Sequence, residues 1–158
     1  MNAPMKLLLA IDGSRASLDA VQWVVALVQA GLKANVVLAN VQEPASLYEM
    51  VVAHDPEVID KASTDAARHI LQPAQALLDA AGVSYSTTVA HGEPSHTLAD
   101  ILEDEGCEMV VLGRGEDALG SVAAELLALS SVPVLVVAPA VEGEGPSGQN
   151  ATCSPTET

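Results

Sequence analysis

Two short segments of the 158-residue chain place glycines beside polar side chains in patterns that could bind a small ligand. In the first, Ile11-Asp12-Gly13-Ser14, a carboxylate follows an apolar run and precedes a residue able to cap a helix. Asp12 could accept hydrogen bonds from a ribose or a base, or hold a metal ion. The alternative is that this aspartate only offsets the positive end of the helix that follows.

The second segment is a glycine-rich loop that begins at Gly113. Gly113 and Gly115 let the backbone approach a ligand closely, and Gly120-Ser121 offers free amides and a hydroxyl at a helix start, which suits a phosphate. The loop is not a Walker A motif, because no lysine stands between Gly120 and Ser121. The match of Gly113-x-Gly115-x2-Ala118 to the dinucleotide-binding fingerprint is weak, because this motif follows the fourth predicted strand rather than the first.

Basic residues are scarce, yet two of them fall near these segments. Arg15 follows the first segment and Arg114 lies in the glycine loop. An anion site in an acidic protein would need such compensation. Ordinary surface pairing of Arg114 with Glu116 or Asp117 is an equal alternative.

The composition excludes several classes of partner. A net charge of −15, from 21 acidic and 6 basic residues, would repel nucleic acids and anionic lipid. The three aromatic residues, Trp23, Tyr48 and Tyr85, offer no stacking platform for single strands. No apolar run reaches the roughly 18 residues of a transmembrane helix, and the run at residues 7–11 is too short for a signal-peptide core. We therefore expect a cytoplasmic protein that binds neither nucleic acid nor membrane.

Five aliphatic runs predict β-strands. The first, fourth and fifth are continuously apolar, which is typical of strands buried on both faces of a parallel sheet. The runs are Lys6–Ile11, Asn35–Val41, Tyr85–Ala90, Met109–Leu112 and Val134–Ala138.

Helical spacing and capping residues predict four helices between these strands. Pro73 should kink or divide the second of them. Ser14, Ser95 and Ser121 are expected to cap helices rather than to act as nucleophiles. The predicted helices run from Ser14 to Gly31, Pro56 to Ala81, Ser95 to Glu105 and Gly120 to Leu129.

Strands that alternate with helices imply right-handed crossovers and an α/β fold with an open, doubly wound parallel sheet. Ligands bind such sheets beyond the carboxyl ends of the strands, where neighbouring connections leave in opposite directions. The Asp12 segment and the glycine loop both lie at that edge. Residues 1–140 form the predicted domain, and residues 141–158 are predicted to be a disordered acidic tail.

Three histidines lie near this edge, at His54, His91 and His96. Their spacing matches neither a helical i, i+4 pair nor a zinc finger, so we predict no metal site.

The order and spacing of segments across residues 5–139 resemble the universal stress protein family. The resemblance implies a five-stranded parallel sheet in the order 3-2-1-4-5, flanked by four helices. It also implies a homodimer joined through the last strand, residues 134–138, and roles in stress survival and signalling. The matching segments are Leu8–Ser14, Val36–Pro44, Gly92-Glu93-Pro94, Glu108–Gly113 and Gly120-Ser121, followed by Val132–Val137.

One branch of this family binds ATP. If the binding residues of this branch are carried over to the present sequence, Asp12 would contact the nucleoside and the backbone near Val41 would contact adenine. The glycine loop would surround the ribose and phosphates. With Arg114 added from the charge argument, the predicted nucleotide-binding residues are Asp12, Val41, Gly113, Arg114, Gly115, Gly120, Ser121 and Val122.

The glycine loop departs from the pattern of the ATP-binding members. Those members resemble Gly-x2-Gly-x9-Gly-Ser/Thr, whereas this chain has Gly113-x-Gly115-x4-Gly120-Ser121, six residues shorter from the first glycine to the last. The end that holds phosphate on a helix start is kept. The span that would cover a triphosphate is largely gone.

Three functional hypotheses follow. The leading one is a cytosolic stress-response module that binds an adenine nucleotide weakly, as ATP, ADP or AMP with Mg. The alternative is a dimeric protein-interaction module of the same fold, with unidentified partners and no nucleotide. The third is a slow nucleotide hydrolase with Asp12 as its base. Strand 134–138 would be an apolar edge if unpaired, so a partner subunit or the chain's own tail is expected to cover it.

Overall fold

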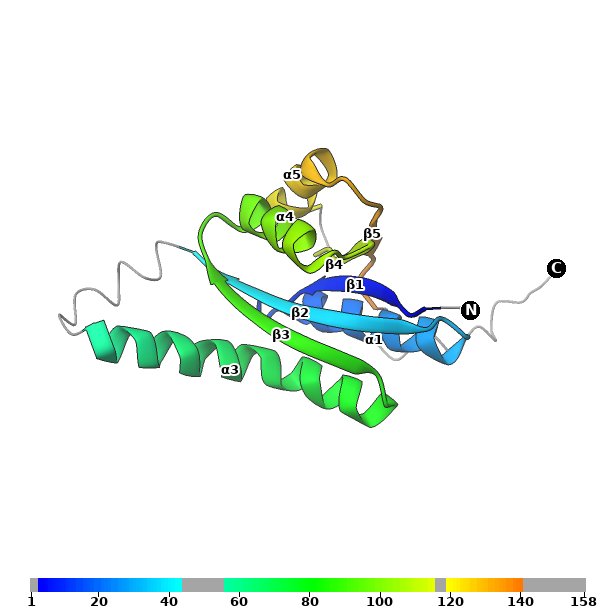
Figure 1. Cartoon of the computed structure of the whole chain (residues 1–158), viewed down its shortest axis with the longest axis horizontal. Helices are drawn as coiled ribbons and strands as arrows, with labels where there is room; N and C mark the ends of the chain where they lie inside the picture. Colours follow the sequence, from blue (N-terminus) through cyan, green and yellow to red (C-terminus); the bar gives the residue numbers. More distant parts are fainter. Residues whose placement is uncertain (1–2, 44–55, 116–118, 141–158) are drawn as a thin grey trace.

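The computed structural model describes residues 3–43, 56–115 and 119–140, and of residues 56–63 the backbone alone. Five parallel strands form one sheet in the order β3-β2-β1-β4-β5 (Figure 1). The predicted strands and their order are confirmed, and no strand end differs by more than one residue. The strands are β1 (Met5–Ala10), β2 (Ala34–Gln42), β3 (Ser84–His91), β4 (Met109–Gly113) and β5 (Val134–Val137).

Two helices cover each face of this sheet (Figure 1). Helices α1 (Arg15–Gln29) and α3 (Pro56–Ala81) lie on one face, and α4 (Pro94–Glu105) and α5 (Ser121–Leu129) lie on the other. The chain leaves β1 toward β2 on one side and later enters β4 on the other side of β1. The carboxyl ends of β1 and β4 therefore form the point where the connections diverge, which is where such sheets bind ligands.

Helix α3 continues through Pro73 as one element of 26 residues. The prediction that Pro73 divides the helix is wrong. The proline removes one backbone donor, but Leu71, Ala74 and Leu78 are buried against the sheet on either side of it. Packing of an apolar helix face supplies most of a helix's stability in a protein, which is enough to offset one missing hydrogen bond.

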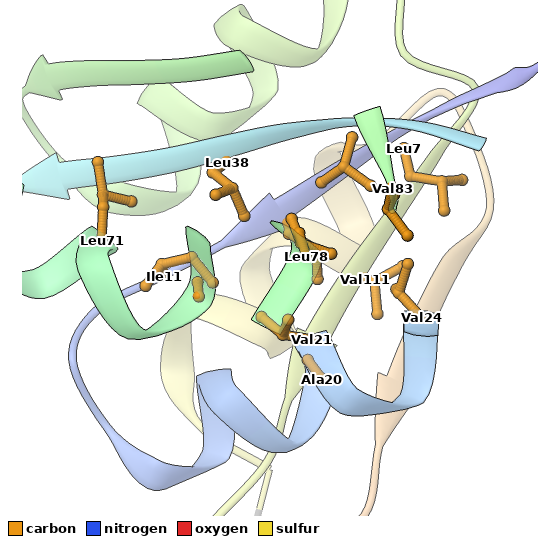
Figure 2. Close-up of a cluster of buried hydrophobic side chains, with 13 residues drawn as sticks. Leu7, Ile11, Ala20, Val21, Val24, Leu38, Leu71, Leu78, Val83 and Val111 are labelled. Atoms are coloured by element: carbon orange, nitrogen blue, oxygen red, sulfur yellow. The ribbon is translucent and has the colours of Figure 1, made fainter. Parts of the chain in front are cut away.

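The continuous apolar runs place alternate side chains on opposite faces of the sheet. Leu7 and Leu9 of β1 pack toward α1 and α3, and Leu8 between them packs toward α4 and α5. Figure 2 shows the first of these clusters, in which side chains from β1, β2, β4, α1 and α3 converge. Both faces are covered, so the runs of β1 and β4 read as unbroken apolar sequence.

Strand β5 is the exception to that burial. Each of its residues from Val134 to Val137 is only half-buried, because β5 is an outer strand that pairs with β4 alone. The expectation that this run is buried on both faces is therefore wrong for β5.

The helix starts confirm one of the three predicted serine caps. Ser14 caps α1, and its side chain accepts a hydrogen bond from the Ser17 amide. Helix α4 begins at Pro94, one residue earlier than expected, and Glu93 rather than Ser95 provides its cap. Gly120 takes the cap position of α5, which has no side-chain capping bond, so Ser121 is not a cap either.

Candidate ligand-binding site

A cavity of about 390 Å³ lies at the carboxyl edge of the sheet, between the end of β1 and the start of α5. Seven of the eight predicted binding residues line it, and only Arg114 does not. The structure therefore brings these seven residues together at one cavity. The predicted residues in its lining are Asp12, Val41, Gly113, Gly115, Gly120, Ser121 and Val122.

Asp12 is held in a tight turn at one end of the cavity. Its Oδ1 accepts a 2.9 Å hydrogen bond from the Ser14 amide, and Ser14 in turn caps α1. Its Oδ2 makes no hydrogen bond to the part of the chain that the structure describes. Asp12 therefore shapes the turn with one oxygen and presents a carboxylate at the cavity with the other.

Two buried amides that sequence reasoning missed fix the strand end that carries Asp12. The Asn40 side chain donates to the carbonyl of Ile11 at 2.9 Å, and the Gln42 side chain donates to Asn40 Oδ1 at 3.2 Å. The Ile11 amide donates to the carbonyl of Ala39 at 2.8 Å. Ile11 is thus anchored through both its backbone groups. The available signal was the presence of two amides within an otherwise apolar strand.

The wall of the cavity beside β2 is apolar, with one carboxylate at its end. Val41 and Ala39 face the cavity from β2, and Pro94 and Leu98 face it from α4. Glu43, the residue after β2, also lines the cavity and was not predicted. A flat apolar wall of this kind suits the faces of a planar ring.

The three glycines of the loop differ in what a side chain at each position would meet. A Cβ at Gly113 would overlap the backbone carbonyl of Ala16 in α1. Close packing of β4 on α1 therefore requires this glycine, independently of any ligand. A Cβ at Gly115 or Gly120 would meet nothing within 4 Å. These two glycines face open space at the cavity, as expected for a backbone that a ligand could approach.

The start of α5 presents its amides to the cavity. Ser121, Val122 and Ala123 line it, and no side chain caps this helix end. The first amides of a helix have no acceptor within the helix and carry the positive end of its dipole. An anionic group of a ligand would be stabilised here.

Neither of the two arginines considered for charge compensation lines the cavity in the described structure. The Arg114 guanidinium donates to the carbonyl of Gly115 at 3.2 Å and lies outside the lining. Arg15 is also outside it. Within the described residues, the only charged side chains of the cavity are those of Asp12 and Glu43. The loop conformation turns Arg114 onto its own backbone, and a sequence pattern does not reveal that direction.

A hydrogen-bonded group next to the cavity joins α4 to α5. Glu93 Oε1 accepts from the His96 amide at 2.9 Å and from the Ser95 hydroxyl at 2.8 Å. Ser95 Oγ, which is fully buried, also lies 2.7 Å from Glu125 Oε1. The backbone hydrogen bond from His96, followed by the His96 and Ser95 side chains, lowers the pKa of Glu93 to about 2. The group fixes the helix pair on one side of the cavity.

Metal-binding side chains do not cluster in the described residues: no group of three or more His, Cys, Asp or Glu is placed to hold an ion. His54 lies outside the described residues. The carboxylates of Asp12 and Glu43 remain the polar side chains best placed to meet a ligand.

A model of the universal stress protein family matches residues 4–138, almost the whole described chain. The chain belongs to this family. Two curated family members are similar to it along most of their length. Universal stress protein Sll1654 from Synechocystis is 30% identical over 139 residues, covering 83% of each chain. Universal stress protein YxiE from Bacillus subtilis is 32% identical over 144 residues, covering 84% of this chain and 97% of the relative.

Solved structures of universal stress proteins and similar chains share the fold. The hypothetical protein MJ0577, 25% identical, superposes with a TM-score of 0.71 over 84% of this chain and 94% of its own. A universal stress protein in complex with cAMP is 23% identical, with a TM-score of 0.63 over 88% and 100% of the two chains. A family protein from Arabidopsis thaliana with AMP bound is 16% identical, with a TM-score of 0.66 over 88% and 94%.

In residues 3–43, 56–115 and 119–140, no helix has the length and apolar character needed to cross a bilayer.

Proposed function

We propose that this universal stress protein is a cytoplasmic stress-response module that binds an adenine nucleotide weakly in the cavity between Asp12 and the start of α5. The observation that carries the proposal is the convergence of seven independently predicted residues on one cavity. Two proteins of the same fold support it, since one was solved with cAMP and one with AMP.

The cavity offers a distinct partner for each part of a nucleotide. The apolar wall of Ala39, Val41 and Leu98 suits the base. The carboxylate of Asp12 can accept from ribose hydroxyls. The amides at the start of α5 suit a phosphate. Binding should be weak, with a Kd on the order of 0.1 mM, because the shortened loop leaves less backbone to enclose the ligand.

The first test is to look for bound nucleotide. Protein purified without added nucleotide is denatured, and the released small molecules are separated and identified. The same preparation is titrated calorimetrically with AMP, cAMP, ADP and ATP, with and without Mg. Retained adenine nucleotide, or saturable heat at sub-millimolar ligand, is the expected result. The absence of both at millimolar ligand would overturn the proposal.

A cavity-filling variant gives the matched control. Gly115→Leu places a side chain in the open space at the cavity and should abolish binding with little change in melting temperature. Ala128→Leu introduces the same side chain on the exposed side of α5 and should leave binding unchanged. Equal affinities of the two variants would show that the ligand binds elsewhere.

A second function, assembly through β5, rests on a separate observation. We propose that the protein forms a homodimer along this strand. Val134–Val137 is apolar, half-buried and at the outer edge of the sheet, and Leu127 and Leu129 of the neighbouring helix are 48% and 41% exposed. An apolar edge strand of this kind is usually covered by another segment of the chain or by a partner subunit.

A further inference from the structure

We propose that the cavity selects its ligand by charge, favouring nucleosides and nucleoside monophosphates over triphosphates, and that Glu43 sets part of this selectivity. The inference rests on the proposed nucleotide binding and goes beyond it, since it assigns the ligand class and a residue that was not among the predicted binding residues.

The charges that line the cavity carry the argument. Asp12 and Glu43 are carboxylates, and no Lys or Arg of the described chain is in the lining. Three of the described basic side chains are engaged elsewhere: Lys6 pairs with Glu105, Arg68 pairs with Asp65, and Arg114 bonds to the carbonyl of Gly115. The sites that bind polyphosphates tightly usually supply Lys, Arg or Mg²⁺ to balance the charge.

The basic residues that adjoin lining residues in the sequence, Arg15 and Arg114, both lie outside the cavity lining. Glu116 and Asp117 follow the glycine pair of the loop, and no Lys or Arg occurs between Glu43 and Lys61. The protein as a whole carries a net charge of −15. A ligand with four negative charges would therefore enter a field that opposes it.

The starts of α1, α4 and α5 all lie at the cavity, but Ser14 and Glu93 cap the first two, and the uncapped start of α5 offers only a small positive charge. A helix N-terminus acts as roughly half an elementary charge. That amount can favour a single phosphate held by free amides. It cannot offset the three phosphates of ATP against two carboxylates, so each added phosphate should weaken binding.

Glu43 is the residue that can be changed without disturbing the fold. It lies just after β2, is exposed, and makes no hydrogen bond or ion pair with the described residues. Asp12, by contrast, holds the Ser14 turn. Glu43→Gln keeps the size of the side chain and removes one negative charge. For charges about 8 Å apart in a wet cavity, this should favour ATP over AMP by about fivefold at low salt.

The experiment compares adenosine, AMP, ADP and ATP by calorimetry in EDTA at several salt concentrations, on the wild type, Glu43→Gln and Glu103→Gln. Glu103 is an exposed glutamate on α4 outside the cavity. We expect affinity to fall from AMP to ATP. Added salt should strengthen ATP binding, because it screens repulsion, and should leave adenosine binding unchanged. Only Glu43→Gln should reduce the difference in affinity between AMP and ATP.

Two contrary results have different meanings. If ATP binds at least as tightly as AMP and weakens as salt is added, the cavity attracts polyphosphate and the charge selectivity is wrong, while nucleotide binding stands. If none of the four ligands binds, the proposed function fails and the selectivity fails with it. Equal responses of the two Gln variants would remove Glu43 as the selective residue.

Discussion

The side-chain amide of Asn40 donates a 2.9 Å hydrogen bond to the carbonyl of Ile11, in the interior of the protein. Asn40 is 2% exposed, so the bond is shielded from water. It joins the carboxyl end of β2 to the residue that precedes Asp12. Strands β1 and β2, which both border the cavity, are thereby held at a fixed separation.

Replacing Asn40 with Ala should destabilise the protein and weaken ligand binding together. The Ile11 carbonyl would lose its partner in a buried place, which costs about 1–3 kcal/mol. The Asp12 turn would also lose its support. Urea unfolding and ligand titration measure the two effects. Asn35→Ala, at an exposed position near the start of the same strand, is the control and should change neither by much.

Gly113→Ala should be far more damaging than Gly115→Ala, although both lie in the same loop. At Gly113 the new methyl group would overlap the backbone carbonyl of Ala16, and at Gly115 it would meet open space. Overpacking of this kind costs typically about 1–3 kcal/mol. Thermal unfolding should show a loss of several degrees for Gly113→Ala and almost none for Gly115→Ala. Similar losses of melting temperature in the two variants would mean that α1 can move away from β4 at little cost in free energy.

The lowered pKa of Glu93 predicts a pH-dependent contribution to stability. Hydrogen bonds from the His96 amide and side chain and from Ser95 lower this pKa from 4.5 to about 2 in the folded protein. A carboxyl with a lowered folded pKa stabilises the protein fully above its unfolded pKa. The contribution disappears as the pH falls from about 4.5 to about 2.

Glu93→Gln tests this directly. The variant should be less stable than the wild type at pH 7, and the difference in urea midpoint should shrink between pH 4.5 and pH 2. Glu103→Gln on the same helix, which makes no side-chain hydrogen bond in the described structure, should show no such convergence. A difference in urea midpoint that stays constant across this pH range would contradict the lowered pKa of Glu93.

The register of β5 identifies a substitution that would block pairing along its outer edge. Carbonyls of Pro133 and Val137 accept from β4, so the backbone groups of Val134 and Val136 point to the open side. Val136→Pro removes an outward amide and leaves the β4 pairing bonds in place. We expect the variant to be monomeric by sedimentation or light scattering, whereas Val136→Ala should remain a dimer. A dimer that survives the proline would place the interface elsewhere.

Local sequence pattern was enough to predict the strands and the sheet edge at which the cavity lies, whereas the strand order was predicted from the family resemblance. The runs around Leu8 and Val111 are apolar without interruption because both faces of their strands are covered. Asp12 and Gly120-Ser121 stand directly after a strand or before a helix, and parallel strands bring such positions to one edge. These inferences need only neighbouring residues and the rules of chain connection.

What the sequence did not reveal depends on partners distant along the chain or on side-chain direction. The carbonyl that Asn40 binds belongs to Ile11, and a lone amide in a strand does not identify its acceptor. The reason for Gly113 lies in Ala16 of another element. Arg114 was expected in the site, and its guanidinium contacts its own loop outside the cavity lining. Glu43 follows a strand that ends at this edge, but the sequence alone does not show that its side chain lines the cavity.

The close packing of Gly113 against Ala16 also limits which parts of this site can change during evolution. That glycine is fixed by the packing of α1, and the next amide, that of Arg114, is bonded to Val137 at 3.0 Å. At the far end, Gly120 is the cap of α5. The loop is therefore anchored to the scaffold at its two ends, and the number of residues between the anchors can change in the course of evolution without rebuilding the sheet. We therefore expect insertions or deletions in this loop to reshape the cavity while the domain that carries it stays intact.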